Sequence, residues 1–176
     1  LLWMGGFWWY PNAEAVLWFV KDILPLVKDK LVEQNIRLHF LGAAPPDELK
    51  HVHDGANVFV HGFVDSLDDM LTSAHLLFVP LLSGGGVRVK ILEAMSNGIP
   101  VLSTSKGCEG LGATDGVDIV VRDDAAGFAE ALLEIAADRE MRVRLSLACR
   151  NLLLEKYNLQ QTIREKDGIY RRLLGV

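Results

Sequence analysis

Short apolar segments alternate with helical segments along this chain, and this alternation constrains the fold more than any other feature of the sequence. Most of the apolar segments end at glycine or proline and are followed by apolar residues at helical spacing. The predicted strands are residues 1–5, 36–41, 57–60, 76–82, 99–104 and 117–121. Strands separated by helices pair in parallel through right-handed crossovers. We therefore predict an α/β fold, a doubly wound Rossmann-like parallel sheet of about six strands.

Helical segments fill the intervals between these strands. A helix is expected from about Asn12, whose side chain can cap it, and Pro25 is expected to end or kink this helix. Another helix is predicted from about Val87 to Asn97, with Gly98 as its left-handed stop. The rest of the chain is predicted to form two or three helices, the last over residues 160–174.

Composition and charge limit the partners. Half of the 176 residues are hydrophobic, and 18 basic against 23 acidic residues leave a net charge of −5, so no basic field for nucleic acid is present. Cys108 and Cys149 are too few for a disulfide scaffold or a zinc site and indicate a reduced, cytoplasmic setting. No apolar run reaches the ~18 residues of a membrane span. Because the chain opens directly on an apolar strand, we expect it to be a piece of a longer protein.

The strongest local signal is the glycine run Ser83-Gly84-Gly85-Gly86 between the fourth strand and the next helix. Glycines let the backbone approach a ligand closely, and a helix start presents unpaired amides and partial positive charge, which suits a phosphate or pyrophosphate. The run is neither a Walker loop, which ends in Gly-Lys-Ser/Thr, nor the dinucleotide fingerprint, which follows the first strand. Taken alone, it is equally consistent with a turn that binds nothing.

Helical spacing places Gly86, Lys90 and Glu93 on one face, at positions i, i+4 and i+7. A carboxylate accepts two hydroxyl hydrogens at once, which suits a ribose diol, and hydrogen bonds to charged groups are strong. The simpler alternative is a surface ion pair between Lys90 and Glu93.

This helix resembles the signature helix of retaining glycosyltransferases of the GT-B fold, in the large family numbered four. Leu92-Glu93-Ala94-Met95 and Gly98-Ile99-Pro100-Val101 match the second half of the family's Glu-x7-Glu region. His61-Gly62-Phe63-Val64 matches its Gly-Phe-Val turn, and residues 107–111 match its loop after the fifth strand. The resemblance covers essentially the whole chain. It identifies residues 1–176 as the C-terminal, nucleotide-sugar-binding half of such an enzyme.

The resemblance implies a glycosyltransferase of glycan biosynthesis that transfers a sugar, a hexosyl unit by expectation, from a nucleoside-diphosphate sugar with retained anomeric configuration. An N-terminal acceptor domain would form the other wall of the cleft and share the catalytic residues, so this chain alone is expected to be inactive. Peripheral membrane association is expected only through that missing domain. No metal or cofactor is expected, because amides and basic side chains can neutralise the leaving diphosphate.

Individual roles are carried over from the family's motifs. The resemblance implies that Glu93 holds the ribose hydroxyls and that the Gly86 and Val87 amides face the diphosphate. It also implies that the backbone around Phe63 and Val64 borders the nucleobase.

Two departures from the family affect the predicted site. The family's first signature glutamate falls on Gly85, which leaves recognition of the donor sugar open. The loop over residues 5–10 lacks the basic residue that the family often places there. Lys90, Arg88 and, less favoured, Lys106 are candidates to supply this charge. Lys90 is preferred because it shares the face of the signature carboxylate, whereas Arg88 lies nearly opposite on an ideal helix.

Two other functions stay open: a GT-B-like sugar-nucleotide epimerase half and a non-catalytic Rossmann-like binding module. A phosphorylase half would need a lysine for pyridoxal phosphate, which nothing in the sequence marks. A receiver domain needs acidic residues after the first strand, where Gly5-Gly6-Phe7 offers none. A nicotinamide enzyme is disfavoured because the glycine run follows the fourth strand. Trp3 and Trp18 are expected in the core or an interface, and Trp8 and Trp9 at the edge of the site.

Overall fold

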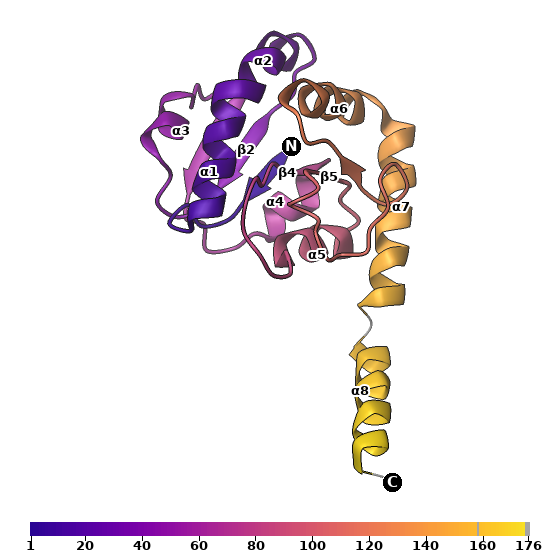
Figure 1. Cartoon of the computed structure of the whole chain (residues 1–176). Helices are drawn as coiled ribbons and strands as arrows, with labels where there is room; N and C mark the ends of the chain where they lie inside the picture. Colours follow the sequence, from indigo (N-terminus) through magenta and orange to yellow (C-terminus); the bar gives the residue numbers. More distant parts are fainter. Residues whose placement is uncertain (158, 175–176) are drawn as a thin grey trace.

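A six-stranded parallel sheet runs through the middle of the molecule, which the computed structural model describes over residues 1–157 and 159–174 (Figure 1). The strands lie in the order β3-β2-β1-β4-β5-β6, and every neighbouring pair is parallel. The predicted doubly wound, Rossmann-like sheet is confirmed, and each predicted strand overlaps an observed one. These are β1 (Leu2–Met4), β2 (Leu38–Leu41), β3 (Val58–Gly62), β4 (Leu77–Val79), β5 (Val101–Ser103) and β6 (Val120–Val121).

Helices cover both faces of the sheet, and the last one extends beyond it (Figure 1). In the described parts of the chain, no helix combines the length and the apolar character that crossing a bilayer needs. The helices are α1 (Tyr10–Trp18), the π-helical turn η1 (Phe19–Ile23), α2 (Leu24–Glu33), α3 (Asp47–His51), α4 (Asp68–Ser73), α5 (Val89–Ser96), α6 (Ala125–Ala137), α7 (Arg139–Lys156) and α8 (Leu159–Leu174).

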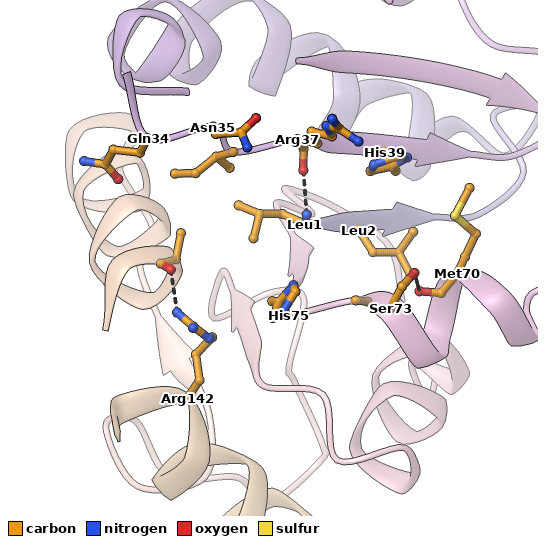
Figure 2. Close-up of a pocket in the computed structure, with 13 residues that line it drawn as sticks. Leu1, Leu2, Gln34, Asn35, Arg37, His39, Met70, Ser73, His75 and Arg142 are labelled. Atoms are coloured by element: carbon orange, nitrogen blue, oxygen red, sulfur yellow. Dashed lines mark hydrogen bonds between the residues drawn. The ribbon is translucent and has the colours of Figure 1, made fainter. Parts of the chain in front are cut away.

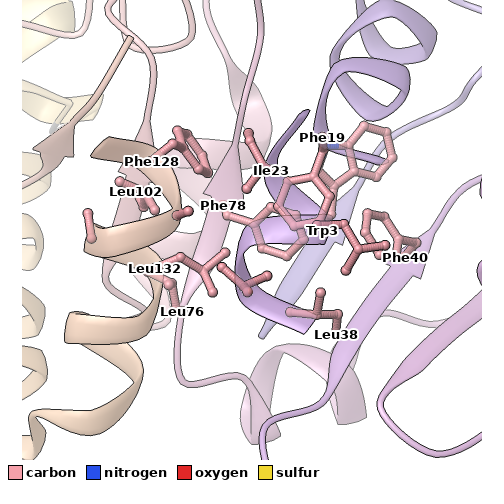
Figure 3. Close-up of a cluster of buried hydrophobic side chains, with 14 of the residues drawn as sticks. Trp3, Phe19, Ile23, Leu38, Phe40, Leu76, Phe78, Leu102, Phe128 and Leu132 are labelled. Carbon is pink, nitrogen blue, oxygen red and sulfur yellow. The ribbon is translucent and has the colours of Figure 1, made fainter. Parts of the chain in front are cut away.

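Successive side chains of the central strands enter two separate cores. In β1, Trp3 packs into the core beneath α1, α2 and α6, whereas Leu2 and Met4 belong to the core beneath α5 and α7. β4 alternates in the same way and places Phe78 on the Trp3 side, among the rings drawn in Figure 3. Because both faces of a central parallel strand are buried, its sequence is apolar throughout. The expectation that Trp3 fills the core is confirmed.

Pro25 does not end the helical path, so the prediction that it ends the helix is wrong. α1 passes into η1 and then into α2, with helical backbone angles at Phe19 and Leu24. Pro25 lies in the first turn of α2. The π turn shifts the hydrogen-bond register just before the proline, so its missing amide and its ring are accommodated without a break in the helical path.

Candidate functional site

A pocket of about 370 Å³ opens at the carboxyl ends of the strands, where the strand order reverses between β1 and β4. In open α/β sheets, ligands bind in the crevice at this reversal. The loops after β1, β2 and β3 line the pocket together with α5. Of the residues predicted from the sequence, Phe63, Val64, Lys90 and Glu93 line this pocket together.

Two glycines let the floor of this pocket form. A Cβ on Gly5 would lie 2.7 Å from both Lys90 Nζ and Asn12 Nδ2, and a Cβ on Gly42 would overlap the carbonyl oxygen of Gly5. The Gly5 amide donates to the Leu41 carbonyl at 2.9 Å, which holds the first two loops together. Side chains at these two positions would therefore separate the loops or displace Lys90.

Lys90 is a partly buried cation without a carboxylate partner in the part of the chain that the structure describes. Its Nζ donates to Asn12 Oδ1 at 2.8 Å and lies 4.7 Å from the centroid of the Trp3 ring. Burial, and secondarily the charge of Arg88, lower the pKa of Lys90 to about 7. The alternative of a Lys90–Glu93 surface pair is therefore not what the structure shows. A desolvated ammonium that lacks a counter-ion is a group prepared for an anionic ligand.

Asn12 has a role that its sequence position did not indicate. The predicted cap is wrong, because Trp9 is the residue at the helix N-terminus and no side chain caps it. Asn12 is buried in the first turn of α1, and its Nδ2 donates to the Gly6 carbonyl at 2.9 Å. Its amide therefore joins the loop after β1 to Lys90. The only signal in the sequence is Pro11-Asn12 close behind a pair of glycines.

Glu93 offers an uncommitted carboxylate to the same pocket. It lies three positions after Lys90 on α5, so the two side chains share a helix face. Among the described residues, no group donates a hydrogen bond to this carboxylate and no cation pairs with it. Both oxygens are thus available to the hydroxyl groups of a ligand.

The glycine run approaches α5 with free amides. Gly84 and Gly86 have φ values of +103° and +82°, a backbone region that favours glycine. A Cβ on Gly85 or Gly86 would meet nothing within 4 Å, so the space before these residues is open. Over residues 1–157 and 159–174, the amides of Gly85, Gly86 and Val87 find no acceptor. These three residues do not line the 370 Å³ pocket but immediately precede the helix that does.

Arg88 precedes α5 as its N-cap, so the helical spacing that placed it opposite Glu93 does not apply. It is 4% exposed, and its Nη1 donates to the carbonyls of Gly85 at 2.6 Å and Gly86 at 3.0 Å. Its guanidinium carbon lies 5.8 Å from the centroid of a Trp9 ring. Lys106, the less favoured candidate, is already paired with Glu109 at 2.6 Å.

A second cavity, of about 640 Å³, lies at the opposite edge of the sheet, near the start of β1 and β2 (Figure 2). It is the larger of the two, but no Asp or Glu side chain lines it. Arg142 Nη1 donates to the carbonyls of Ile135 and Ala136, and burial lowers the pKa of His39 to about 4. We place the candidate site in the smaller pocket, because Lys90 and Glu93 both line it and neither has a partner of opposite charge among the described residues.

Other chemistries find little support in the parts of the chain described. No three His, Cys, Asp or Glu side chains gather there as a metal site. Burial raises the pKa of the Cys108 thiol, so little thiolate forms near neutral pH. Trp8, which the sequence placed at the edge of the site, does line the pocket and is 77% exposed.

Comparisons with solved structures agree with this architecture. The complex of an S. aureus TarM mutant with fondaparinux, alpha-GlcNAc-glycerol and UDP superposes with a TM-score of 0.76 at 15% identity, over 96% of this chain and 35% of that one. The C-terminal domain of the LpcC glycosyl transferase group 1 family protein from Francisella tularensis superposes with a TM-score of 0.67 at 14% identity, over 90% of this chain and 84% of that one. The shared fold is the Rossmann-like half of a GT-B glycosyltransferase.

Sequence comparison identifies the family. An uncharacterized 44.6 kDa protein in the cps region of Klebsiella pneumoniae is 26% identical over 168 residues, which cover 90% of this chain and 42% of that protein. The chain thus spans less than half the length of this curated relative. Residues 1–138 match the family described as glycosyl transferases group 1. On this match, which covers most of its length, the chain belongs to the glycosyl transferases group 1 family.

Proposed function

We propose that this chain is the C-terminal, donor-binding domain of a retaining glycosyltransferase of the large family four. The observation that carries the proposal is that Lys90 and Glu93 lie on one face of α5 and line the same pocket without contacting each other as an ion pair. The ammonium has no counter-ion and the carboxylate no donor within the described residues. A nucleoside diphosphate supplies what each lacks, because it carries anionic phosphates and a ribose diol.

Each part of the donor has a proposed partner. Glu93 accepts hydrogen bonds from the two ribose hydroxyls, and the ammonium of Lys90 neutralises the diphosphate together with the Gly86 and Val87 amides. The backbone at Phe63, on the loop that borders the pocket, lies beside the nucleobase. When the bond between the sugar and the diphosphate breaks, its electron pair moves onto a phosphate oxygen. Preorganised positive charge stabilises that oxygen, so the proposal requires no metal and no cofactor.

Transfer requires a second wall for the cleft. The chain spans only 42% of its Klebsiella relative, so we propose that an N-terminal acceptor domain of the full-length protein completes the site. We expect this chain alone to bind the nucleotide without transferring sugar. The TarM complex contains UDP, which supports a sugar nucleotide as donor. The open space at Gly85, in place of the family's first glutamate, leaves the choice of sugar to other residues.

The remaining assignments are also proposals. We propose a role in glycan biosynthesis, in line with the location of the Klebsiella relative in the cps region. A reduced, cytoplasmic setting is consistent with Cys108 and Cys149, which are both free. The net charge of −5 gives no basic field for nucleic acid.

Nucleotide binding tests the proposal directly. We expect the 176-residue chain to bind at least one of UDP, GDP and ADP, and to bind the corresponding nucleoside at least about tenfold more weakly, because the nucleoside lacks the phosphates that Lys90 attracts. Isothermal titration calorimetry measures both affinities. Absence of binding to all three diphosphates at millimolar concentration would remove the basis for a donor site here.

The affinity for the diphosphate is expected to fall as the pH rises above 7. The pKa of Lys90 in the free protein is about 7, and a bound diphosphate raises it by favouring the charged ammonium. Binding is therefore strongest below pH 7 and weakens by up to about tenfold per pH unit, until the pH passes the pKa of the complex. The range from about pH 7 to about pH 9 is suitable, because a terminal phosphate with a pKa of about 6 is already ionised there.

The variant Lys90→Met is the control for this titration. It should give a nearly flat profile over the same range, since the titrating ammonium is gone. An equally steep profile in the variant would assign the proton to another group.

A further inference from the structure

Arg88 is buried behind the glycine run in an unusual state for a charged side chain. It is 4% exposed, and Trp9 covers its guanidinium. Its Nε and Nη2 atoms are buried without a hydrogen-bond partner, and none of the ion pairs among the described residues involves it. A Cβ on Gly84 would lie 3.3 Å from Nη2, so the guanidinium packs closely against the back of the glycine run.

The third guanidinium nitrogen sets the direction of two peptide groups. Nη1 donates to the carbonyls of both Gly85 and Gly86, at 2.6 and 3.0 Å. In a trans peptide, the carbonyl and the amide of the next residue point in opposite directions, and the chain has no cis peptide bond over its described residues. A Gly85 carbonyl directed at Arg88 therefore directs the Gly86 amide away from it. The Gly86 carbonyl does the same for the amide of Val87.

Both amides, like that of Gly85, lack an acceptor among the described residues. Gly86 has a φ of +82°, and the space where its Cβ would stand is empty within 4 Å. Successive amides that point the same way in a turn make a concave site for anions. The buried positive charge directly behind them strengthens their attraction for an anion. Without Arg88, the glycines would allow these peptide groups many orientations.

We propose that Arg88 is a positioning residue that holds the Gly86 and Val87 amides toward the diphosphate, and that Trp9 keeps Arg88 in place. The inference rests on the proposed function, since it assigns the ligand that these amides meet. It differs from a direct contact between Arg88 and the donor, because the guanidinium acts through the backbone of the glycine run. An arginine buried with unpaired donors lowers the stability of the folded protein. We therefore infer that Arg88 serves to fix the geometry of the glycine run, and that it does not stabilise the fold.

The test uses the 15N-labelled chain, with inorganic pyrophosphate and the best-bound nucleoside diphosphate as probes. In the wild type, the amide resonances of Gly86 and Val87 should shift on binding. In Arg88→Met, both probes should bind about tenfold more weakly, and the two resonances should no longer shift to the wild-type end point at saturation. The Tm of Arg88→Met should stay the same or rise.

Arg142 supplies a matched control. Its Nη1 also donates to two successive carbonyls, those of Ile135 and Ala136, but it lies at the other edge of the sheet. Arg142→Met should lower the Tm, because it removes hydrogen bonds from the end of α6, and leave the affinity for both probes unchanged.

Variants at Trp9 and Arg88 distinguish a positioning role of Arg88 from a purely electrostatic one. Trp9→Leu should weaken pyrophosphate binding, and adding it to Arg88→Met should cause no further loss, because Trp9 acts through Arg88. Arg88→Lys keeps a positive charge but replaces the planar guanidinium, so it should bind several-fold more weakly than the wild type.

The outcomes distinguish this inference from the proposed function. If the wild type binds a nucleoside diphosphate and Arg88→Met binds it equally well, the positioning role is wrong and the donor site stands. Weaker binding with the wild-type amide shifts intact would make Arg88 a direct ligand, which also overturns the inference. If Arg88→Met does not fold, Trp9→Leu decides by the same two readouts. A wild type that binds neither probe overturns both proposals.

Discussion

Replacing Glu93 with alanine should lower the affinity for the best nucleoside diphosphate by about 100-fold or more. The carboxylate has no donor among the described residues, so in our proposal it is reserved for the two ribose hydroxyls. Each hydrogen bond to a charged group is worth roughly 1.5–3 kcal/mol, and the loss of two such bonds accounts for the effect. The affinities of wild type and variant can be compared by isothermal titration calorimetry at fixed salt and pH.

The ribose itself gives a sharper form of this experiment. The wild type should bind the 2′-deoxy form of the same diphosphate at least about tenfold more weakly than the ribose form, whereas Glu93→Ala should bind both forms alike. Glu130→Ala, at an exposed position on α6, is the matched control and should behave as the wild type. If Glu93→Ala still discriminates between ribose and deoxyribose, the carboxylate does not hold the diol.

Replacing Lys90 with methionine should weaken binding and stabilise the fold at the same time. Removing one partner of a buried charge pair costs about 2 kcal/mol or more, so the affinity for the diphosphate should fall about 30-fold or more at pH 7. In the unliganded protein this ammonium is largely desolvated and has no counter-ion among the described residues. Replacement of such an ion by an apolar side chain of similar size is worth roughly 1–4 kcal/mol of stability. Thermal unfolding should therefore show a Tm several degrees higher.

The stability difference between the wild type and Lys90→Met is expected to depend on pH. The folded-state pKa of Lys90, about 7, lies below its usual value of 10.5, so the unfolded chain binds the proton more tightly. The wild type is penalised fully below pH 7, and its stability recovers as the pH rises toward 10.5. The advantage of Lys90→Met should therefore be largest below pH 7 and shrink above it. Lys28→Met, at an exposed position on α2, should change neither stability nor affinity. A Lys90→Met variant that melts earlier than the wild type would contradict this account of the buried ammonium.

The fold was largely predictable from the sequence, because a strand that is covered by helices on both faces of the sheet consists almost entirely of apolar residues. Leu76–Leu82 is apolar throughout, as the position of β4 between two helical layers requires. The error at Pro25 has a local cause. The proline rule assumes an unbroken α-helical register before residue 25, and the π turn over Phe19–Ile23 supplies a different one.

That Lys90 and Glu93 share one helix face could be anticipated in the same way, because both lie on one helix and helical geometry fixes their relative direction. The position of Arg88 could not be anticipated from the sequence. The prediction extended α5 by two residues toward the glycine run, and a residue outside the helix does not follow helical spacing. Its burial under Trp9 depends on the loop after β1, which is remote in sequence and adjacent only in the folded chain.

The sequence by itself determined the order of strands and helices, the glycine run before α5 and the residues that share a helix face, since each depends on neighbours close along the chain. Only the tertiary structure decided which distant loops meet. It brought Asn12 to Lys90 and Trp9 to Arg88, and it left the carboxylate of Glu93 without a partner among the described residues. Those contacts depend on strand order and on the close approach of Gly5 and Gly42, which are long-range packing effects that no local pattern records.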